Sequence, residues 1–403
     1  MRRMVALFFL LLTNSVDASP FRVLVFPHQG GYPSPQGKES VVSKVRVVSE
    51  SSCNQYVAKM NAKNEWEKVG SPISFSNHYA FTNSYFRRLA RFFFGSGDTF
   101  YFECQKPFKV LRDSKLESYS YEGDFVVVYD QASIQKPIQI INVIDPEKYI
   151  QGVVPSEVST GWPKEALRAQ AVAARSYAWW TVLNSRNKPT QSYDLDDTIA
   201  YQAYLGISRK FADTDAAVTD TSRLVMKYAG KVIKAYFSAD SGGKTESEAN
   251  VFGDDLPYCK SKNELYDVSK TQTEWEKTFS YDELARTFSS SLQLLMVEPA
   301  DLNESGRASL VTLVSANGKR VKIRGSEFRR TLRLRSTLFE LNTIMENGVK
   351  MLQIKGKGFG HGVGMAQIGA KEYASQMRWT FDQIVKFYYT GITLEPIIDE
   401  YSE

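Results

Sequence analysis

Residues 356–369 combine the residue types best suited to holding a ligand. They read GKGFGHGVGMAQIG, with glycines alternating around His361, the last of three histidines in the chain. Glycine reaches backbone conformations that other residues avoid, and it lets a ligand approach the main chain closely. The segment is interpreted either as a ligand-binding loop or as an array of β-turns with a histidine facing solvent.

Glu157 is a candidate for acid–base chemistry. It follows the apolar, proline-containing stretch VVPS and precedes an alanine-rich segment. Burial disfavours the charged form of a carboxyl group and raises its pKa, so a glutamate in such a place can hold a proton near neutral pH and act as a general acid. The alternative is a glutamate that caps the next helix or forms an ion pair at its entrance.

Arg175 lies among small apolar residues in the stretch AQAVAARSYA. Buried guanidinium groups are seldom left unpaired, so Glu157 or a carboxylate of the substrate would be natural partners. A salt bridge with no catalytic consequence is the alternative.

A further polar cluster, SADSGGKT at residues 238–245, directly follows an expected strand. Its hydroxyl groups and exposed amides suit a binding turn. It lacks the GxxxxGK[ST] spacing of a phosphate-binding loop and the GxSxG pattern of a nucleophile elbow. A nucleophilic pair of Ser241 and His361 is a third interpretation, with no motif behind it.

The elements that must position these residues are strands up to residue 144 and a mixture of helices and strands after it. Runs of β-branched and aromatic residues predict strands at residues 21–26, 41–48, 125–129 and 138–144. Asp145 and Pro146 then indicate the start of a helix, because aspartate caps helices and proline fits their first turn. The alanine-rich residues 163–183 predict a longer helix that packs closely against its neighbours.

Shorter elements follow. Residues 213–221, 281–288, 367–376 and 381–388 predict helices, and residues 224–228 and 232–237 predict strands. The basic and aromatic segment 87–94 is expected to be a strand or helix buried on one side. Together these patterns favour an α+β fold.

Length and composition limit the classes of function. The chain has 403 residues, of which 43% are hydrophobic and 24% charged, as in ordinary globular proteins with two domains or one large domain and an accessory one. The net charge of +5 is spread along the chain without a long basic block, so we expect no nucleic-acid partner.

The first 18 residues predict a secretory signal. Arg2 and Arg3 supply the positive start, an apolar run follows that is too short to span a bilayer, and small residues precede a plausible cleavage site. An uncleaved N-terminal anchor is the alternative. In an oxidising compartment Cys53 and Cys104 can pair, which leaves Cys259 as a partly buried thiol. The three histidines are far apart in sequence, so we expect neither a metal site nor a cofactor.

Six segments, taken in order, resemble the stage II sporulation protein D family, also described as amidase-enhancer or LytB-like proteins. They are INVIDPEKYIQGVVPSEV, WPKEALRAQAVAARSYA, AYQAYLG, AYFSADSGGKTESEANVFGDDLPY, GKGFGHGVGMAQIGAKEYA and IVKFYYTGITL. The resemblance covers about residues 108–394 and leaves the N-terminal β-rich region largely outside. The strand and turn pattern predicts residues 19–105 as a small β-rich accessory domain. The resemblance implies residues 106–396 as a mixed catalytic domain with helices around the active-site cleft, and residues 397–403 are expected to be a tail.

The resemblance implies an exported peptidoglycan lytic transglycosylase that acts on glycan strands whose stem peptides an N-acetylmuramoyl-L-alanine amidase has removed. The alternatives are a non-catalytic glycan-binding activator of such an amidase, a Ser/His hydrolase and a hydrolytic muramidase. The resemblance places catalysis on Glu157 and Arg175. Its implied substrate contacts are Ser241, Gly242, Gly243 and His361, followed by the weaker candidates Gln202, Tyr204, Gln367 and Tyr389. Some relatives bind zinc next to the Ser-Gly-Gly turn, but residues 236–241 here contain neither histidine nor cysteine.

Overall fold

The computed structural model describes residues 19–25, 44–49, 51–74, 78–82, 99–112, 119–129, 138–186, 192–198, 200–267, 273–288, 293–298 and 300–397. These residues form eight α-helices and several β-sheets, which confirms the expected α+β class. The expected signal at residues 1–18 and the basic aromatic segment 87–94 lie outside the described residues. In the described part of the chain, no helix has the length and apolar character needed to cross a membrane.

Two sheets form the N-terminal part of the molecule. A mixed seven-stranded sheet has the order β11-β1-β10-β9-β6-β3-β4, and a four-stranded sheet has the order β5-β2-β7-β8. The seven strands are β1 (Phe21–Leu24), β3 (Cys53–Met60), β4 (Trp66–Ser74), β6 (Thr99–Cys104), β9 (Asp124–Tyr129), β10 (Ile138–Ile144) and β11 (Leu195–Asp196). The four strands are β2 (Lys44–Ser49), β5 (His78–Thr82), β7 (Phe108–Arg112) and β8 (Ser120–Tyr121).

The larger sheet crosses the division expected at residue 105. Strand β6 pairs with β9 in antiparallel fashion, and β1 pairs with both β10 and β11. The N-terminal strands and helices α2 and α3 contribute to one hydrophobic cluster. The sheet therefore supports the helices directly.

A disulfide joins Cys53 to Cys104, which lie directly opposite each other on the paired strands β3 and β6. This confirms the pairing that the sequence suggested. Cys259 is a buried free thiol, and burial raises its pKa to about 12. At neutral pH this thiol stays protonated and is a poor nucleophile.

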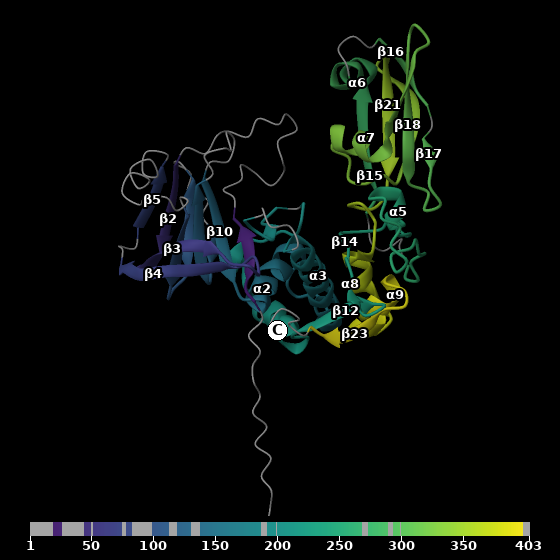
Figure 1. Cartoon of the computed structure of the whole chain (residues 1–403). Helices are drawn as coiled ribbons and strands as arrows, with labels where there is room; N and C mark the ends of the chain where they lie inside the picture. The colour runs from purple at the N-terminus through teal and green to yellow at the C-terminus, as the bar shows by residue number, and fades with distance from the viewer. Residues whose placement is uncertain are drawn as a thin grey trace, which may run out of the picture.

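Helices α2 (Pro146–Glu157), α3 (Lys164–Ser185) and α4 (Ala212–Asp220) form the centre of the molecule (Figure 1). The expected start of α2 is confirmed, since Asp145 Oδ1 accepts a hydrogen bond from Lys148 N at 3.0 Å and Pro146 occupies the first turn. Most of α3 is buried, with one face in the N-terminal cluster and another in a C-terminal one. Its alanines allow this close packing on both sides.

The C-terminal cluster contains helices α8 (Gln367–Gln376) and α9 (Phe381–Tyr388), whose bounds agree with the sequence prediction. Strands β12 (Leu224–Tyr228), β13 (Lys231–Val232) and β23 (Thr393–Pro396) form a small sheet beside them. The strand expected at residues 232–237 is wrong as a single element. The chain instead leaves β13 and pairs again only at β14 (Phe237–Ser238), in parallel with β22 (Met365–Ala366).

Residues 275–356 form an inserted domain with its own hydrophobic core, extending away from the helices (Figure 1). One sheet has the order β15-β21-β20, and β18 pairs with β16, β17 and β19 in another. Its elements are β15 (Trp275–Ser280), α6 (Tyr281–Phe288), β16 (Leu294–Val297), β17 (Asp301–Leu302), β18 (Ala308–Ser315), β19 (Arg320–Arg324), α7 (Gly325–Thr331), β20 (Phe339–Glu346) and β21 (Val349–Gly356). Helix α6 has the bounds expected from the sequence, but the separate core was not expected.

Candidate active site

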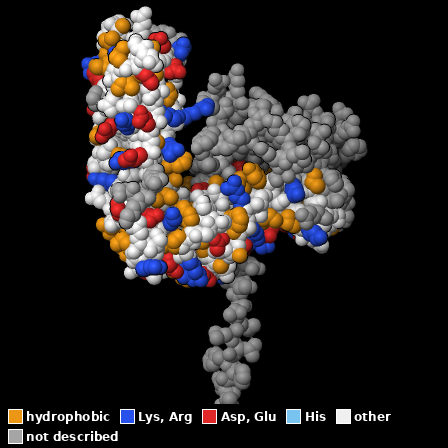
Figure 2. Space-filling view, turned by 180° about the vertical axis from the view of Figure 1, so that it is seen from behind, with side chains coloured by type: hydrophobic (Ala, Val, Ile, Leu, Met, Phe, Trp, Pro, Cys, Tyr) orange, Lys and Arg blue, Asp and Glu red, His pale blue; other side chains and the backbone are white. Residues whose placement is uncertain are grey.

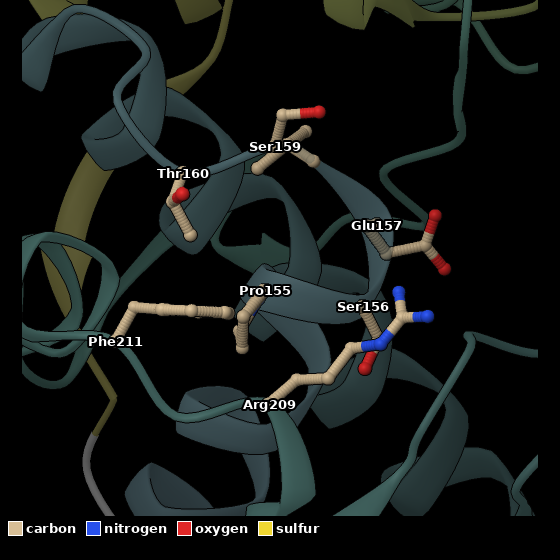
Figure 3. A pocket seen from close by; sticks show the side chains of 8 residues that line it. Pro155, Ser156, Glu157, Ser159, Thr160, Arg209 and Phe211 are labelled. Carbon is tan, nitrogen blue, oxygen red and sulfur yellow. The ribbon is translucent and has the colours of Figure 1, made fainter.

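A pocket of about 360 Å³ opens at the end of α2 (Figure 3). Residues at and just after the end of α2 form one part of it. The other part comes from the last residue of the short helix η1 (Gly206–Arg209) and the residue that precedes α4. The lining residues are Pro155, Ser156, Glu157, Val158, Ser159, Thr160, Arg209 and Phe211. A space-filling view from behind shows the surface hollowed between the inserted domain and the helical centre, with Lys and Arg side chains projecting from the inserted domain (Figure 2).

Glu157 is the last residue of α2, which ends because Val158 adopts an extended backbone. Its Oε1 accepts a hydrogen bond from Ala203 N at 2.7 Å, and its Oε2 lies 3.5 Å from Gln367 Nε2, a weak contact. Burial raises the pKa of Glu157, and the contacts with Ala203 and Gln367 oppose the rise. The expectation of a carboxyl group with a raised pKa is confirmed, and among the described residues Glu157 is the only carboxylic acid that lines the pocket.

Gln367 connects Glu157 to the glycine-rich residues. It is the first residue of α8, directly after strand β22, which pairs with β14 of the Ser-Gly-Gly segment. Ile368 N also donates to Ala239 O at 3.0 Å. The structure therefore brings the acid, the Ser-Gly-Gly turn and the glycine loop into one region.

Arg175 does not line this pocket. Its buried guanidinium group forms an ion pair with Glu147 at 2.7 Å and donates to the carbonyl groups of Val218 and Leu224 at 3.2 Å each. These contacts join α3 to the first turn of α2, to α4 and to the start of strand β12. The geometry corresponds to the salt-bridge alternative that the sequence left open.

Three of the weaker candidates are buried and bonded within the protein. The side chain of Gln202 donates to Ala174 O at 3.1 Å, and the hydroxyl of Tyr204 donates to Asn142 Oδ1 at 2.9 Å. The hydroxyl of Tyr389 donates to Tyr236 O at 2.6 Å. These side chains form hydrogen bonds inside the protein near the site and do not line the pocket.

Ser241 directs its hydroxyl to another carboxylate, since its Oγ donates to Glu264 Oε1 at 2.6 Å. Glu264 also accepts hydrogen bonds from the hydroxyl groups of Tyr373 and Tyr388. Gly242 and Gly243 both have positive φ, as the turn requires. Sequence reasoning missed Glu264, because no local motif connects it to Ser241.

His361 is also engaged inside the protein. Its Nδ1 accepts a hydrogen bond from Val363 N at 3.0 Å, and its ring contacts Tyr236 and Phe252 edge-on. Burial, aided by the charges of Arg329 and Arg307, lowers the pKa of His361 to about 3. The histidine is neutral at physiological pH, and Ser241 is bonded to Glu264, so this arrangement does not form a Ser/His nucleophilic pair.

Arg209 and Phe211 are pocket residues that the sequence analysis missed. Figure 3 shows the side chain of Arg209 extending toward the end of α2 beside Ser156 and Glu157. Phe211 is 44% exposed. No motif surrounds them, so only the fold reveals their position. Among the described residues, no group of three or more His, Cys, Asp or Glu side chains is arranged to hold a metal ion.

The fold and the pocket thus define an α+β protein with a single acidic group in an open, polar site. A family model described as stage II sporulation protein matches residues 134–228, which include Glu157 and Arg209. The chain belongs to the stage II sporulation protein D family. A second model, described as a domain of unknown function (DUF8618), matches residues 259–364, which include the inserted domain and His361.

The chain is similar to an uncharacterized protein of Brachyspira hyodysenteriae, with 36% identity over 284 residues covering 69% of this chain and 73% of the relative. It is 34% identical to stage II sporulation protein D of Bacillus amyloliquefaciens over 266 residues, covering 62% and 73%. It is also 29% identical to a protein named amidase enhancer of Bacillus subtilis over 295 residues, covering 61% and 40%.

Proposed function

We propose that this protein is an exported peptidoglycan lytic transglycosylase with Glu157 as its acid–base residue. The observation that carries the proposal is the position of Glu157, which is partly buried at a pocket and has a raised pKa. A carboxyl group in that state can donate a proton near neutral pH. Membership of the stage II sporulation protein D family supports a role at the cell wall.

A single carboxyl group is sufficient for this chemistry. Most glycosidases need two carboxylates, one on each side of the scissile bond. A transglycosylase needs only one, because the substrate provides its own nucleophile. The presence of one carboxylic acid among the described residues lining the pocket fits the transglycosylase mechanism.

Protonated Glu157 donates its proton to the glycosidic oxygen between N-acetylmuramic acid and N-acetylglucosamine. The bond from that oxygen to the anomeric carbon of the muramic acid breaks, with assistance from the N-acetyl group, and the N-acetylglucosamine leaves with a hydroxyl. The Glu157 carboxylate then removes the proton from the C6 hydroxyl of the muramic acid. This oxygen attacks the anomeric carbon, a 1,6-anhydro ring closes, and Glu157 ends protonated as it began.

Mass spectrometry of the products from peptide-free glycan strands tests this proposal. Ends in the form of 1,6-anhydro-N-acetylmuramic acid are the expected result, and Glu157→Gln protein should give none. Reducing ends would instead indicate a hydrolase with a water nucleophile. Absence of any cleavage by the wild-type protein would overturn the enzymatic proposal.

A glycan-binding activator of a peptidoglycan amidase is a second candidate, favoured by the similarity to a protein named amidase enhancer. In this function the protein would bind glycan strands and raise the rate of an N-acetylmuramoyl-L-alanine amidase without cleaving the strands itself. Measuring amidase turnover with and without Glu157→Gln protein separates the two functions. An activator retains its effect in this variant, whereas an effect that depends on strand cleavage disappears.

A further inference from the structure

The pocket beside Glu157 contains a cation that has no partner among the residues that the structure describes. Arg209 is exposed, and within the described residues it forms neither an ion pair nor a hydrogen bond through its side chain. The next residue, Lys210, pairs with Glu122 at 3.2 Å. Arg168, on the nearby helix α3, pairs with both Glu165 and Asp220. These neighbouring cations thus have carboxylate partners, whereas Arg209 has none among the described residues.

The backbone holds Arg209 in place. Gly206, at the start of η1, has φ of 58°, and a Cβ atom added there would lie 2.0 Å from Ser120 O. Ser208 Oγ accepts a hydrogen bond from Ser120 N at 2.9 Å. The short helix is therefore fixed against strand β8, and Arg209 is presented on a rigid turn at the pocket.

Glu157 is not the partner of this cation. Among the described residues, the Glu157 carboxyl accepts a hydrogen bond from Ala203 N and contacts Gln367 Nε2, and no ion pair or hydrogen bond joins it to Arg209. The pocket therefore combines an acid whose pKa is raised by burial with a cation that pairs with no carboxylate among the described residues. Such a site is electrostatically suited to a ligand that brings its own negative charge.

A glycan strand of peptidoglycan has one kind of ionisable group, the lactyl carboxyl of each N-acetylmuramic acid. Where a stem peptide is attached, this carboxyl is part of an amide and has no charge. Where the peptide has been removed, it is a carboxylate. Phe211, 44% exposed in the same pocket, offers an apolar face on which a sugar ring can pack.

We propose that Arg209 binds the free lactyl carboxylate of an N-acetylmuramic acid and so selects strands that have lost their stem peptides. This inference rests on the proposed function, because it assigns a substrate-selecting residue to the same pocket. Arg209 is a specificity-determining residue in this scheme, while Glu157 performs the chemistry.

The test compares two polymers that differ only at this carboxyl: peptide-free strands, and the same strands after carbodiimide coupling of the lactyl carboxyl to methylamine. The wild-type protein should prefer the carboxylate form by on the order of 10–100-fold in kcat/KM, the range for one charge-assisted hydrogen bond or ion pair. Arg209→Gln should reduce this preference to less than about threefold, and Arg209→Lys should restore part of it.

Arg324→Gln is the matched control, since it removes the same charge from an exposed arginine of the inserted domain. This variant should keep the full wild-type preference for the carboxylate form of the polymer. Arg209 is exposed and has no side-chain partner in the described part of the chain, so its variants should have the melting temperature of the wild type, which excludes misfolding as a cause.

Equilibrium binding of both polymers to Glu157→Gln protein separates this inference from the proposed function. If the wild type cleaves neither polymer but the binding preference depends on Arg209, the transglycosylase proposal fails and the carboxylate site stands. If the wild type cleaves or binds both polymers equally well, the role of Arg209 is overturned and the transglycosylase proposal is unaffected.

Discussion

Arg175 forms its ion pair with Glu147 rather than with Glu157, although both glutamates belong to helix α2. They lie near opposite ends of this 12-residue helix, about 15 Å apart along its axis, so one guanidinium group cannot reach both. Within the part of the chain that the structure describes, the acid at the pocket therefore has no cationic partner. Burial raises the pKa of Glu157, and Arg175 does not oppose this rise because it pairs with Glu147 and joins α3 to the start of α2.

Arg175→Met should destabilise the fold. It leaves Glu147 without its cation and the carbonyl groups of Val218 and Leu224 without their donor, so we expect the free energy of unfolding to fall by about 3 kcal/mol. Chemical denaturation gives this value. Cleavage per folded molecule should remain near that of the wild type, and an inactive but fully stable variant would instead assign Arg175 a catalytic role.

Glu157→Gln should abolish cleavage without harming the fold. Burial raises the pKa of Glu157 in the folded protein. Such a group lowers the stability of the fold as the pH rises from the pKa in the unfolded chain, about 4.3, through the pKa in the folded protein. The glutamine does not ionise, so the variant should melt at the same temperature as the wild type below pH 4. At neutral pH it should melt at the same temperature or higher. A lower melting temperature at neutral pH would contradict this electrostatic account.

The rate of strand cleavage should fall as the pH rises. The first step needs protonated Glu157, and its raised pKa extends the protonated form toward neutral pH. We expect kcat to decline with a single ionisation above the ordinary range for glutamate. His361 should contribute no ionisation near pH 6.5, since its pKa is lowered to about 3. A His361→Gln variant with an unchanged pH profile is the control, and a shifted profile would implicate the histidine.

Gly364→Ala should disrupt the contact between the glycine loop and the strand before the Ser-Gly-Gly turn. Gly364 has φ of 71°, and a Cβ atom there would lie 1.9 Å from Tyr236 O, which accepts a hydrogen bond from Met365 N. We expect a loss of more than about 3 kcal/mol in the free energy of unfolding. Gly230→Ala is the matched control, with φ of 77° and open space around the added atom, and should lose only about 1–2 kcal/mol. Equal losses of unfolding free energy in the two variants would mean that a small shift of the backbone relieves the contact between the added Cβ atom and Tyr236 O.

Reduction of the disulfide should destabilise the N-terminal sheet. Cys53 and Cys104 are 51 residues apart in sequence, and opening a loop of that size restores chain entropy equivalent to about 4 kcal/mol in the unfolded state. Guanidinium unfolding with and without a reductant measures the difference. A Cys53→Ala/Cys104→Ala variant should match the reduced protein and be insensitive to reductant, and a wild type with equal stability in both conditions would contradict the prediction.

Much of this protein follows from its local sequence. Asp145 and Pro146 determine where α2 begins, because capping and the fixed φ of proline act within one turn of the helix. The bounds of α6 and α9 follow from amphipathic periodicity, which also needs no distant partner. The raised pKa of Glu157 was foreseeable because its apolar neighbours in sequence also bury it in space.

The tertiary structure decided which polar groups meet. Arg175 forms an ion pair with Glu147, and Ser241 donates a hydrogen bond to Glu264. Arg209 lines the pocket beside Glu157. In each case the residues come from segments far apart along the chain. No local pattern encodes such pairs, because hydrogen bonds and ion pairs depend on the distance between side chains in space rather than on their spacing in sequence. The sequence by itself determined the acid and the helix that ends at it. Only the fold decided that, among the described residues, this acid has no cationic partner and an arginine without a carboxylate partner lies in the same pocket.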